Sequence, residues 1–266
     1  MNRDGNAPCN RVATGGRALI DALGAQRGIV SFVGAGGKKS AMYRIADAHP
    51  GRVLVTTTAH IERFPRRYLE ASVLDTGDRL DERVRALQSA RVIAVAKHGF
   101  RPGRYAGLDD AELQRLYRDG GFDVCLVKAD GARGKLIKAP AEHEPAVSLH
   151  TSVLVPVLSA QAIGQPLSEK MAHRPDRIAA LTGARLGEPL APDHIIRLLI
   201  EADGLLKGAG DATVVPLINM VDDVEREALV REVATRALAL SCRFDRVVLA
   251  AMRRDDPVVA IVTRQG

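Results

Sequence analysis

Short, uniformly apolar runs alternate with helical patterns along this chain, and this alternation constrains the fold more than any other feature. Runs rich in Val, Ile and Leu are typical of strands buried on both faces. Such strands occur in parallel sheets that are covered by helices on each side. The sequence therefore predicts an α/β domain with a doubly wound, mostly parallel sheet. We expect strands at residues 29–33, 52–57, 91–96, 124–129, 153–158, 214–218 and 247–251.

The remaining segments complete a single domain over residues 1–266. Residues 258–262 follow Pro257 and could add a closing antiparallel edge strand. We expect helices at residues 38–48, 109–117 and 222–240, loops at 97–107 and 131–148, a small and mainly helical insert at 161–207, and a flexible N-terminal segment at 1–17.

Composition excludes several classes of protein. With 266 residues and 46% hydrophobic residues, the chain can bury a core without disulfide bonds, which excludes disordered, collagen-like and disulfide-scaffold proteins. Its cysteines, Cys9, Cys125 and Cys242, lie far apart and lack the spacing of a zinc site, so reduced thiols in the cytoplasm fit best. The sequence contains no run of about 18 uncharged apolar residues, so no membrane span is expected.

The net charge of +6 suggests an anionic partner. Of the 38 basic residues 30 are arginine, whose planar guanidinium suits phosphate, although genomic base composition can also enrich arginine. Nucleic acid is not expected as a partner, because acidic residues interleave with the basic ones, aromatic residues make up only 3% of the chain, and tryptophan is absent. The charge points first to a small phosphate-bearing ligand.

The segment from Gly28 to Ser40, GIVSFVGAGGKKS, is the most informative motif. An apolar strand runs into Gly34, Ala35, Gly36 and Gly37, then into Lys38, Lys39 and Ser40 at the start of a helix. This order brings backbone N–H groups and a helix N-terminus toward a phosphate chain, with Lys38 as a cation for the phosphates. The segment resembles the P-loop pattern G-x-x-x-x-G-K-[ST], with Phe32 in place of the first glycine and Lys39 in place of the hydroxyl residue.

Two other interpretations of the glycine-rich turn were weighed. The dinucleotide pattern G-x-G-x-x-G fails because Lys39 stands where its third glycine belongs. A purely structural turn remains possible. We therefore expect nucleotide binding, by ATP or GTP, in a P-loop NTPase-like fold, and leave the structural turn as the alternative.

Asp130 ends the buried run at residues 124–129 and would lie beside this loop. A carboxylate at that place can hold Mg²⁺, with Ser40 as the nearest hydroxyl ligand, and Lys38 and Asp130 are then the candidate catalytic residues. The alternative is a simple Asp-Gly turn. Thr57 closes the second strand and offers a further hydroxyl, although threonine is also a common strand residue.

Asn219 and Asp222 follow the sixth predicted strand. GTP-binding folds place Asn-Lys-x-Asp at such a position, where the Asp binds guanine, but Met220 replaces the lysine here. Asp222 could instead cap the last long helix. We therefore expect these two residues to contact the base, with guanine as the suggested ring.

Taken together, several motifs resemble the YqeC family, whose members are described as accessory proteins for selenium-dependent molybdenum hydroxylases. The resemblance spans residues 18–249, and the order of its motifs along the chain is far more specific than any single motif. It is carried by VGAGGK at 33–38, VTTTAHI at 55–61, ADGARG at 129–134, KAPAEHEP at 138–145, HRP at 173–175 and GLLKG at 204–208.

The resemblance implies a cytoplasmic, nucleotide-binding protein that acts with Mg²⁺ in the maturation of a molybdenum hydroxylase. Family members usually carry threonine where this chain has Lys39, and glutamate where it has Lys128. We expect a P-loop-type NTPase. Because both replacements add positive charge near the expected site, the alternative is a non-hydrolysing, nucleotide-gated adaptor that docks on the hydroxylase or its cofactor-loading partner. The hydroxylase or its maturation factors are the expected partners.

The loop at residues 138–145 is a further candidate. Lys138, Glu142, His143 and Glu144 follow Asp130, and the resemblance suggests that this loop closes over the nucleotide or contacts a second substrate. A solvated surface loop is the alternative. Arg174 is a candidate anion clamp, while Pro175 could simply start a helix.

Overall fold

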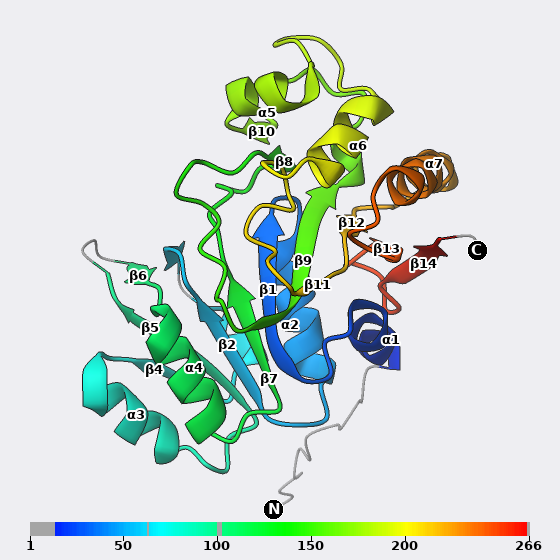
Figure 1. Cartoon of the computed structure of the whole chain (residues 1–266). Helices are drawn as coiled ribbons and strands as arrows, with labels where there is room; N and C mark the ends of the chain where they lie inside the picture. The colour runs from blue at the N-terminus through cyan, green and yellow to red at the C-terminus, as the bar shows by residue number, and fades with distance from the viewer. Residues whose placement is uncertain (1–13, 63, 100–102, 265–266) are drawn as a thin grey trace, which may run out of the picture.

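A parallel sheet forms the centre of the protein in the computed structural model, which describes residues 14–62, 64–99 and 103–264. Strand β1 (Gly28–Gly34) lies in the middle, between β7 (Val124–Lys128) and β9 (Thr151–Ser159), and both neighbours run parallel to it (Figure 1). These strands are almost entirely buried, as their apolar composition predicts.

The sheet extends from this centre in both directions. Beyond β7 lie β2 (Val53–Thr57), β5 (Val92–His98) and β4 (Ala71–Leu74), and all of these pairs are parallel. Beyond β9 lie β12 (Leu217–Asn219), β13 (Arg246–Ala250) and β14 (Val258–Thr263). Only β14 among these pairs antiparallel, which confirms the closing edge strand expected after Pro257.

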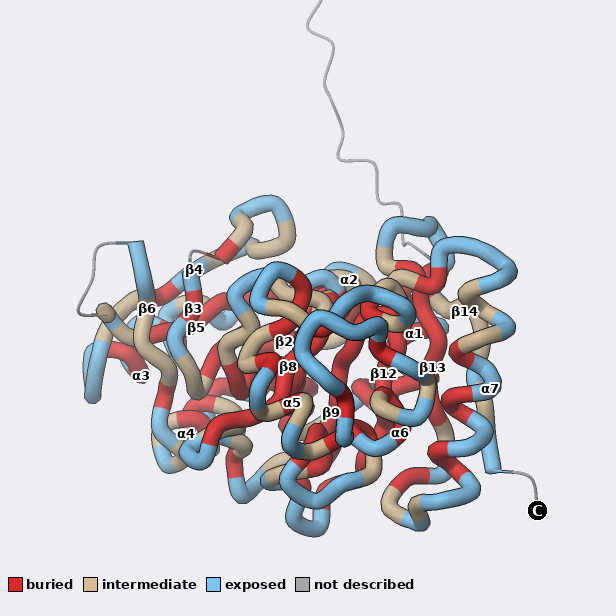
Figure 2. Tube along the Cα trace, turned by 90° about the horizontal axis from the view of Figure 1, so that it is seen from above, coloured by how far each residue is buried: buried red, intermediate tan, exposed pale blue. Residues whose placement is uncertain are grey.

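Helices cover both faces of the sheet, so the prediction of an α/β fold with a mostly parallel sheet is confirmed. Helices α1 (Thr14–Leu23) and α2 (Lys38–Ala48) share one hydrophobic core with one face of the sheet. The opposite face is covered by α3 (Gly77–Arg85), α4 (Asp110–Asp119), α6 (Pro192–Ile200) and α7 (Val224–Leu240). Seen from above, the strands form a buried centre within a more exposed shell (Figure 2).

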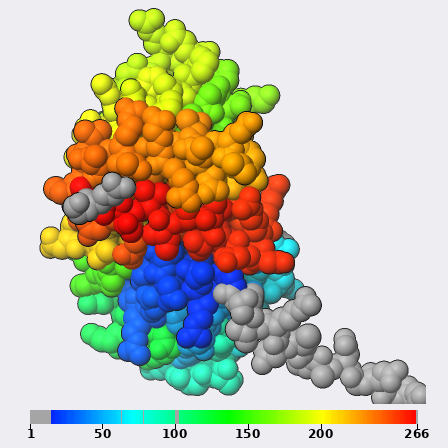
Figure 3. Space-filling view, turned by 90° about the vertical axis from the view of Figure 1, so that its right-hand side faces the viewer, coloured from blue at the N-terminus to red at the C-terminus, as the bar shows by residue number. Residues whose placement is uncertain are grey.

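Local signals explain where several helices begin. Asp109 caps α4 and forms a reciprocal capping box with Glu112, and Asp223 caps α7. Pro175 and Pro192 occupy the first positions of α5 (Pro175–Thr182) and α6, where a missing N–H costs nothing. The last strand, β14, packs beside the first helix, α1, on the side of the molecule that Figure 3 shows.

The predicted insert at residues 161–207 contains α5 and α6. Its apolar side chains do not form a separate core. Ile178, Ile195 and Leu198 belong to the same core cluster as Leu154 and Leu158 of β9. The insert therefore lies as an extension over the carboxyl end of the sheet, at the top of Figure 1.

Some expected boundaries were wrong. The strand expected at 214–218 is divided into β11 (Thr213–Val214) and β12, because Pro216 lies between them and has no N–H for the ladder. The loop expected at 97–107 begins as the end of β5 and contains β6 (Arg104–Ala106), which pairs antiparallel with β5 and with β3 (Ile61–Glu62).

The N-terminal expectation also needs a correction. Residues 14–17 begin α1 and are not part of a flexible segment, because the apolar face of this helix packs on α2 and the sheet. Residues 1–13 lie outside the described residues. Within the described chain, no helix has the length and apolar character needed to cross a bilayer.

The order of the strands produces a switch point in the sheet. The chain passes from β7 to β9 across β1, so connections leave the carboxyl ends of these strands in opposite directions. In open parallel sheets, ligands bind outside the carboxyl ends of the strands at such a switch point. The loop after β1 and Asp130 after β7 both lie at this place.

Candidate functional site

Polar residues gather at the carboxyl edge of the sheet, where five neighbouring strands end. The turn from Gly34 to Gly37 follows β1 and leads directly into α2. The other strands contribute Thr57 from β2, Lys128 and Asp130 from the end of β7, Ser159 from β9 and Asn219 from β12.

The turn after β1 is short and firmly held. Gly34, Gly36 and Gly37 have φ angles of 87°, 81° and 130°, which favour glycine. The N–H of Gly34 donates to Asp130 Oδ2 at 2.9 Å, that of Ala35 to the carbonyl of Val157 at 2.8 Å, and that of Gly36 to the carbonyl of Lys135 at 3.0 Å. These three N–H groups are therefore directed into the protein.

Close packing also requires glycine at these positions. A Cβ on Gly34 would lie 2.2 Å from the carbonyl oxygen of Val157, and one on Gly37 would lie 2.1 Å from Nδ2 of Asn219. The glycines thus allow the turn to approach β9 and β12. The structural role that the sequence left open is therefore present at Gly34 and Gly37.

The first turn of α2 provides the donors that the glycine turn does not. Gly37 precedes the helix and offers no side-chain cap. The N–H groups of Lys38, Lys39 and Ser40 belong to the first turn and have no acceptor within the helix. Together with the positive end of the helix dipole, these groups can bind an anion. Lys39 is half-buried beside them, and Ser40 is exposed.

Lys38 is buried and already paired. Its Nζ lies 2.7 Å from Oδ1 of Asp130 and also donates to the carbonyl oxygen of Gly34. Burial lowers the pKa of Lys38, and the negative charge of Asp130 opposes that shift. The structure therefore brings together the two residues that the sequence assigned to the reaction.

Lys138 extends this ion pair toward the helical insert. Its ammonium group is fully buried, forms an ion pair with Asp130 Oδ2 at 3.0 Å, and donates to Glu144 Oε2 at 2.6 Å and to the carbonyl of Gly131 at 2.7 Å. Glu144 in turn accepts from Arg174, at the start of α5, at 2.7 Å. A chain of alternating charges thus runs from α2 to α5.

The charges along this chain shift two further groups. Burial favours a higher pKa for Glu144, but hydrogen bonds from Arg174 and Lys138 outweigh it and lower the pKa to about 2. Burial and the positive charge of Arg174 lower the pKa of His173 to about 4. Glu144 is therefore a carboxylate near neutral pH, and His173 is uncharged there.

Lys128 adds a further buried cation, and no carboxylate in the described part of the chain forms an ion pair with it. Its side chain is 7% exposed and donates to the carbonyl oxygen of His60 at 3.0 Å. Burial, followed by the repulsion from Lys38, lowers its pKa to about 8. At neutral pH the group is still mostly charged, so it raises the positive potential in front of α2.

Cations outnumber carboxylates in this cluster, which we name the cationic cluster. Its four cations face only two carboxylates. Removing unpaired charge from water is costly unless an opposite charge is supplied. An anion at the N-terminus of α2 would supply it. The cluster consists of Lys38, Lys128, Lys138, Arg174, Asp130 and Glu144.

Mg²⁺ does not fit at Asp130 in this arrangement. Both carboxylate oxygens face ammonium groups, from Lys38 and Lys138, and Oδ2 also accepts the Gly34 N–H. Ser40, the other expected ligand, lies on the exposed side of the first helical turn. No group of three or more His, Cys, Asp or Glu side chains suited to a metal ion occurs within the described residues.

The residues expected to contact the base have other roles. Nδ2 of Asn219 donates to the carbonyl of Gly36 at 2.8 Å, its Oδ1 accepts from the N–H of Met252, and only 2% of the residue is exposed. Asp222 is exposed and accepts from Gln161 at 3.0 Å. The structure therefore does not bring these two side chains together as a base pocket.

Thr57 is also occupied within the protein. Its hydroxyl group donates to the carbonyl of Lys128 at 2.7 Å and accepts from the N–H of Ala59 at 3.1 Å. In the loop at 138–145, Glu142 and His143 are exposed, whereas Lys138 and Glu144 turn inward. No signal in the sequence separates the two buried residues of this loop from the two exposed ones, because a local pattern does not indicate whether a charged side chain is buried.

Comparison with known proteins agrees with the motif order. The sequence model described as YqeC protein matches residues 30–176, which is more than half of the chain. The chain is also 30% identical over 200 residues to "Uncharacterized protein YqeC" of Escherichia coli (strain K12), covering 71% of this chain and 75% of that protein. The chain belongs to the YqeC family.

The matched region places the candidate site within the part shared by the YqeC family. Residues 30–176 contain β1 from its third residue onward, the start of α2 and every member of the cationic cluster. Asn219 and Asp222 lie beyond it. The name of the Escherichia coli relative assigns no activity, and the chemistry of the site follows from its residues.

Proposed function

We propose that this protein binds the phosphates of a nucleotide, ATP or GTP, at the N-terminus of α2, and that it acts as a nucleotide-gated adaptor in the maturation of a molybdenum hydroxylase. The excess of buried positive charge in the cationic cluster carries the first part of this proposal. The second part rests on the resemblance to accessory proteins of selenium-dependent molybdenum hydroxylases.

The protein groups suit phosphate oxygens in number and in kind. The N–H groups at residues 37–40 stand at the positive end of α2, and Lys39 and Lys128 lie close to them. Charge-assisted hydrogen bonds from such donors are about twice as strong as neutral ones. A triphosphate bound here would neutralise the positive charge of the cationic cluster that its two carboxylates do not balance.

Binding would change the partner of Lys38. In the structure, Lys38 is paired with Asp130, so phosphate and carboxylate compete for one ammonium group. Asp130 keeps the Gly34 N–H and Lys138 when Lys38 leaves it. The carboxylate therefore keeps an ion pair and a hydrogen bond at Oδ2 and loses the ammonium group beside Oδ1. Its link through Lys138 to Glu144 and Arg174 reaches the helical insert.

This link supports an adaptor over an efficient hydrolase. Asp130 faces two ammonium groups, so it is poorly placed to hold Mg²⁺ beside the phosphates. Binding energy at α2 can instead bias the position of the segment that holds Arg174. The P-loop-type NTPase remains the alternative, and measured turnover would establish it.

Calorimetric titration of the full-length protein with ATP and GTP tests the proposed site. We expect Lys38→Ala to weaken triphosphate binding at least tenfold, the loss of one strong charge-assisted contact. Lys170→Ala, a change at an exposed lysine, serves as the matched control and should leave the affinity unchanged. Equal affinities of both variants, with unchanged melting temperatures, would show that the glycine turn is only structural.

Phosphate release with Mg²⁺ present separates the two modes of action. An adaptor binds the triphosphate without releasing phosphate, even when a purified selenium-dependent molybdenum hydroxylase is added. Its affinity for that hydroxylase should differ between the nucleotide-bound and nucleotide-free protein. Phosphate release over multiple turnovers would show that the protein is an NTPase and not an adaptor. A hydroxylase affinity that is the same with and without nucleotide would contradict nucleotide gating.

A further inference from the structure

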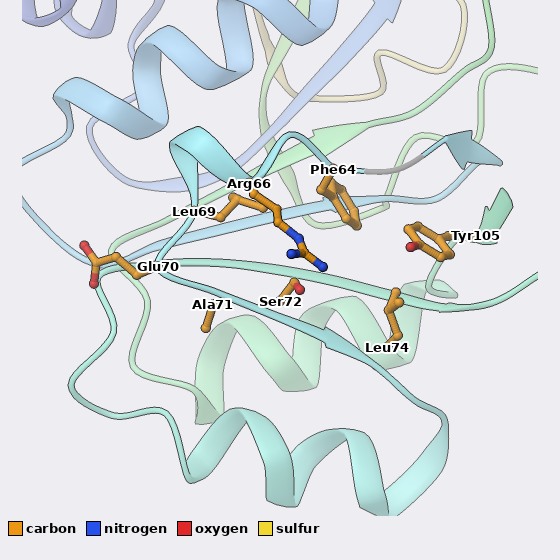
Figure 4. A pocket seen from close by; sticks show the side chains of 8 residues that line it. All are labelled: Phe64, Arg66, Leu69, Glu70, Ala71, Ser72, Leu74 and Tyr105. Atoms are coloured by element: carbon orange, nitrogen blue, oxygen red, sulfur yellow. The ribbon is translucent and has the colours of Figure 1, made fainter. Parts of the chain in front are cut away.

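A cavity of about 720 Å³ opens away from the cationic cluster, between strand β4 and the short helix η1 (Arg66–Tyr68) (Figure 4). Its volume lies within the range of small-molecule sites. Phe64, Arg66, Leu69, Ser72, Leu74 and Tyr105 line it.

The cavity exists because this part of the sheet lacks a covering helix. Along β4, Val73 packs with α3 and α4 on one face, while Leu74 packs with the core on the opposite face. On that opposite face α2 contacts β7 and β2. Over β4, the cover consists of the segment that contains Phe64 and Leu69, and it leaves an opening beside Ser72.

Aromatic rings are concentrated around this opening. The rings of Phe64 and Tyr105 stack with centroids 6.1 Å apart and an angle of 22° between their planes. Tyr43 of α2 stacks on Tyr68 of η1 at 5.2 Å, next to the lining segment of the cavity but outside its lining. The chain has only five Phe and four Tyr, so four of its nine Phe and Tyr rings lie in this small region. Such rings provide flat apolar surface for another ring.

Arg66 gives the cavity a charge. Figure 4 shows its guanidinium group reaching from η1 over Ser72 toward the two aromatic residues, while the carboxylate of Glu70 points away. Among the described residues, no carboxylate pairs with Arg66. The adjacent Arg67 lies instead over the ring of Tyr68, at 4.6 Å. A guanidinium directed into an aromatic cavity suits a planar acidic group.

We propose that this cavity binds a small molecule with a planar aromatic ring and an anionic substituent. The ring would pack against Phe64 and Tyr105, and the anionic group would accept hydrogen bonds from Arg66. Ser72, which is exposed beside the opening, adds a hydroxyl group to the lining of the site.

This site is separate from the proposed phosphate site. Strand β4 lies three strand positions from β7, across β5 and β2, which corresponds to about 14 Å at the usual strand spacing. The cavity and Lys128 belong to the same side of the sheet, yet no residue lines both. Binding in the cavity can therefore be tested without assuming nucleotide binding.

Ligand-observed NMR and calorimetry with naphthalene-2-sulfonate test the proposal on the full-length protein. The neutral 2-naphthol and the non-aromatic cyclohexanesulfonate are the comparison probes. We expect the aromatic sulfonate to bind at least tenfold more tightly than either comparison probe. Arg66→Gln and Tyr105→Leu should each weaken it at least tenfold, whereas Arg67→Gln, the neighbouring control, should leave it unchanged.

Each outcome bears on the cavity directly. Absence of sulfonate binding to the wild-type protein overturns the proposal, as does equal binding of the three probes. An equal loss in Arg66→Gln and Arg67→Gln also overturns it, because general surface charge would then explain the affinity. Melting temperatures identify a variant that fails to fold, and Ser72→Phe, which fills the cavity from its exposed side, then provides the second test of lost binding.

Discussion

The Nζ atom of Lys38 lies 2.7 Å from Oδ1 of Asp130, so the lysine proposed to bind phosphate is held by a carboxylate of the same chain. A bound phosphate must replace this partner. Since Asp130 is also ion-paired with Lys138 and accepts from the Gly34 N–H, it loses one of three partners when Lys38 moves. The pair therefore limits phosphate affinity without leaving a carboxylate unpaired.

Asp130→Asn is expected to tighten phosphate binding and to destabilise the fold. The amide removes the charge that competes for Lys38, so affinity for ATP should rise severalfold in the absence of Mg²⁺. The same change leaves the buried Lys138 with one carboxylate, which should lower the free energy of unfolding by about 3 kcal/mol. Calorimetry and urea unfolding measure the two effects. Weaker ATP binding that depends on Mg²⁺ would instead assign Asp130 to a metal.

Lys128→Met is expected to stabilise the protein near pH 7 and to weaken anion binding. The folded-state pKa of Lys128, about 8, lies below the ordinary value of 10.5. The unfolded chain therefore binds more protons between these values, and the wild-type protein gains stability as the pH rises from 8 to 10.5. At pH 7 the variant should be more stable by about 2 kcal/mol, and this advantage should shrink above pH 8.

Urea unfolding at pH 7 and pH 9.5 measures this advantage. Lys170→Met, which changes an exposed lysine, is the control and should show neither the gain nor its pH dependence. The affinity for ATP should fall severalfold in Lys128→Met. A variant that is stabilised equally at both pH values would show that the charge of Lys128 is not the cause.

Much of the fold follows from local pattern in the sequence. Helix α2 has the predicted bounds, 38–48, and β1, β7, β13 and β14 lie within one or two residues of their predicted positions. Uniformly apolar strands and the Pro257 boundary are strong local signals. Elements fixed by distant contacts were missed. Strand β4, for example, is short and half-exposed, and its pairing with β5 decides its conformation.

The candidate site shows the same limit. The sequence correctly indicated that Lys38 and Asp130 lie at one edge of the sheet, because the ends of neighbouring parallel strands meet there. It could not show that Lys138 is fully buried, since lysine is rarely buried and no pattern marks the exception. The sequence also could not show that the Asn219 amide donates to the carbonyl of Gly36 in the glycine turn. The sequence pattern predicts instead that this amide contacts the nucleotide base.

Asn219→Ala is expected to weaken ATP and GTP binding by the same factor. Its amide holds the carbonyl of Gly36 and the N–H of Met252, so its loss loosens the turn before α2 and should lower the free energy of unfolding by about 1–3 kcal/mol. Parallel titrations with the two nucleotides measure the factor. Asp222→Asn, at an exposed position, should change neither affinity. A selective loss of GTP binding in either variant would restore the guanine interpretation.

Glu144→Gln is expected to destabilise the protein near neutral pH and progressively less in acid. The folded-state pKa of Glu144 is about 2 because hydrogen bonds from Arg174 and Lys138 outweigh the effect of burial, whereas the ordinary value is 4.5. Its contribution is therefore fully present above pH 4.5 and is lost as the pH falls toward 2. Since the side chain is partly exposed, we expect a loss of about 2 kcal/mol at pH 7.

Urea unfolding of wild type and Glu144→Gln at pH 7, 5 and 3.5 follows this contribution. The difference in the free energy of unfolding should be similar at pH 7 and 5 and clearly smaller at pH 3.5, because the unfolded wild-type chain is by then largely protonated at Glu144. Glu142→Gln, two residues away and exposed, should leave the free energy unchanged at all three values. A constant difference for Glu144→Gln would mean that its packing, and not its charge, links Lys138 to Arg174.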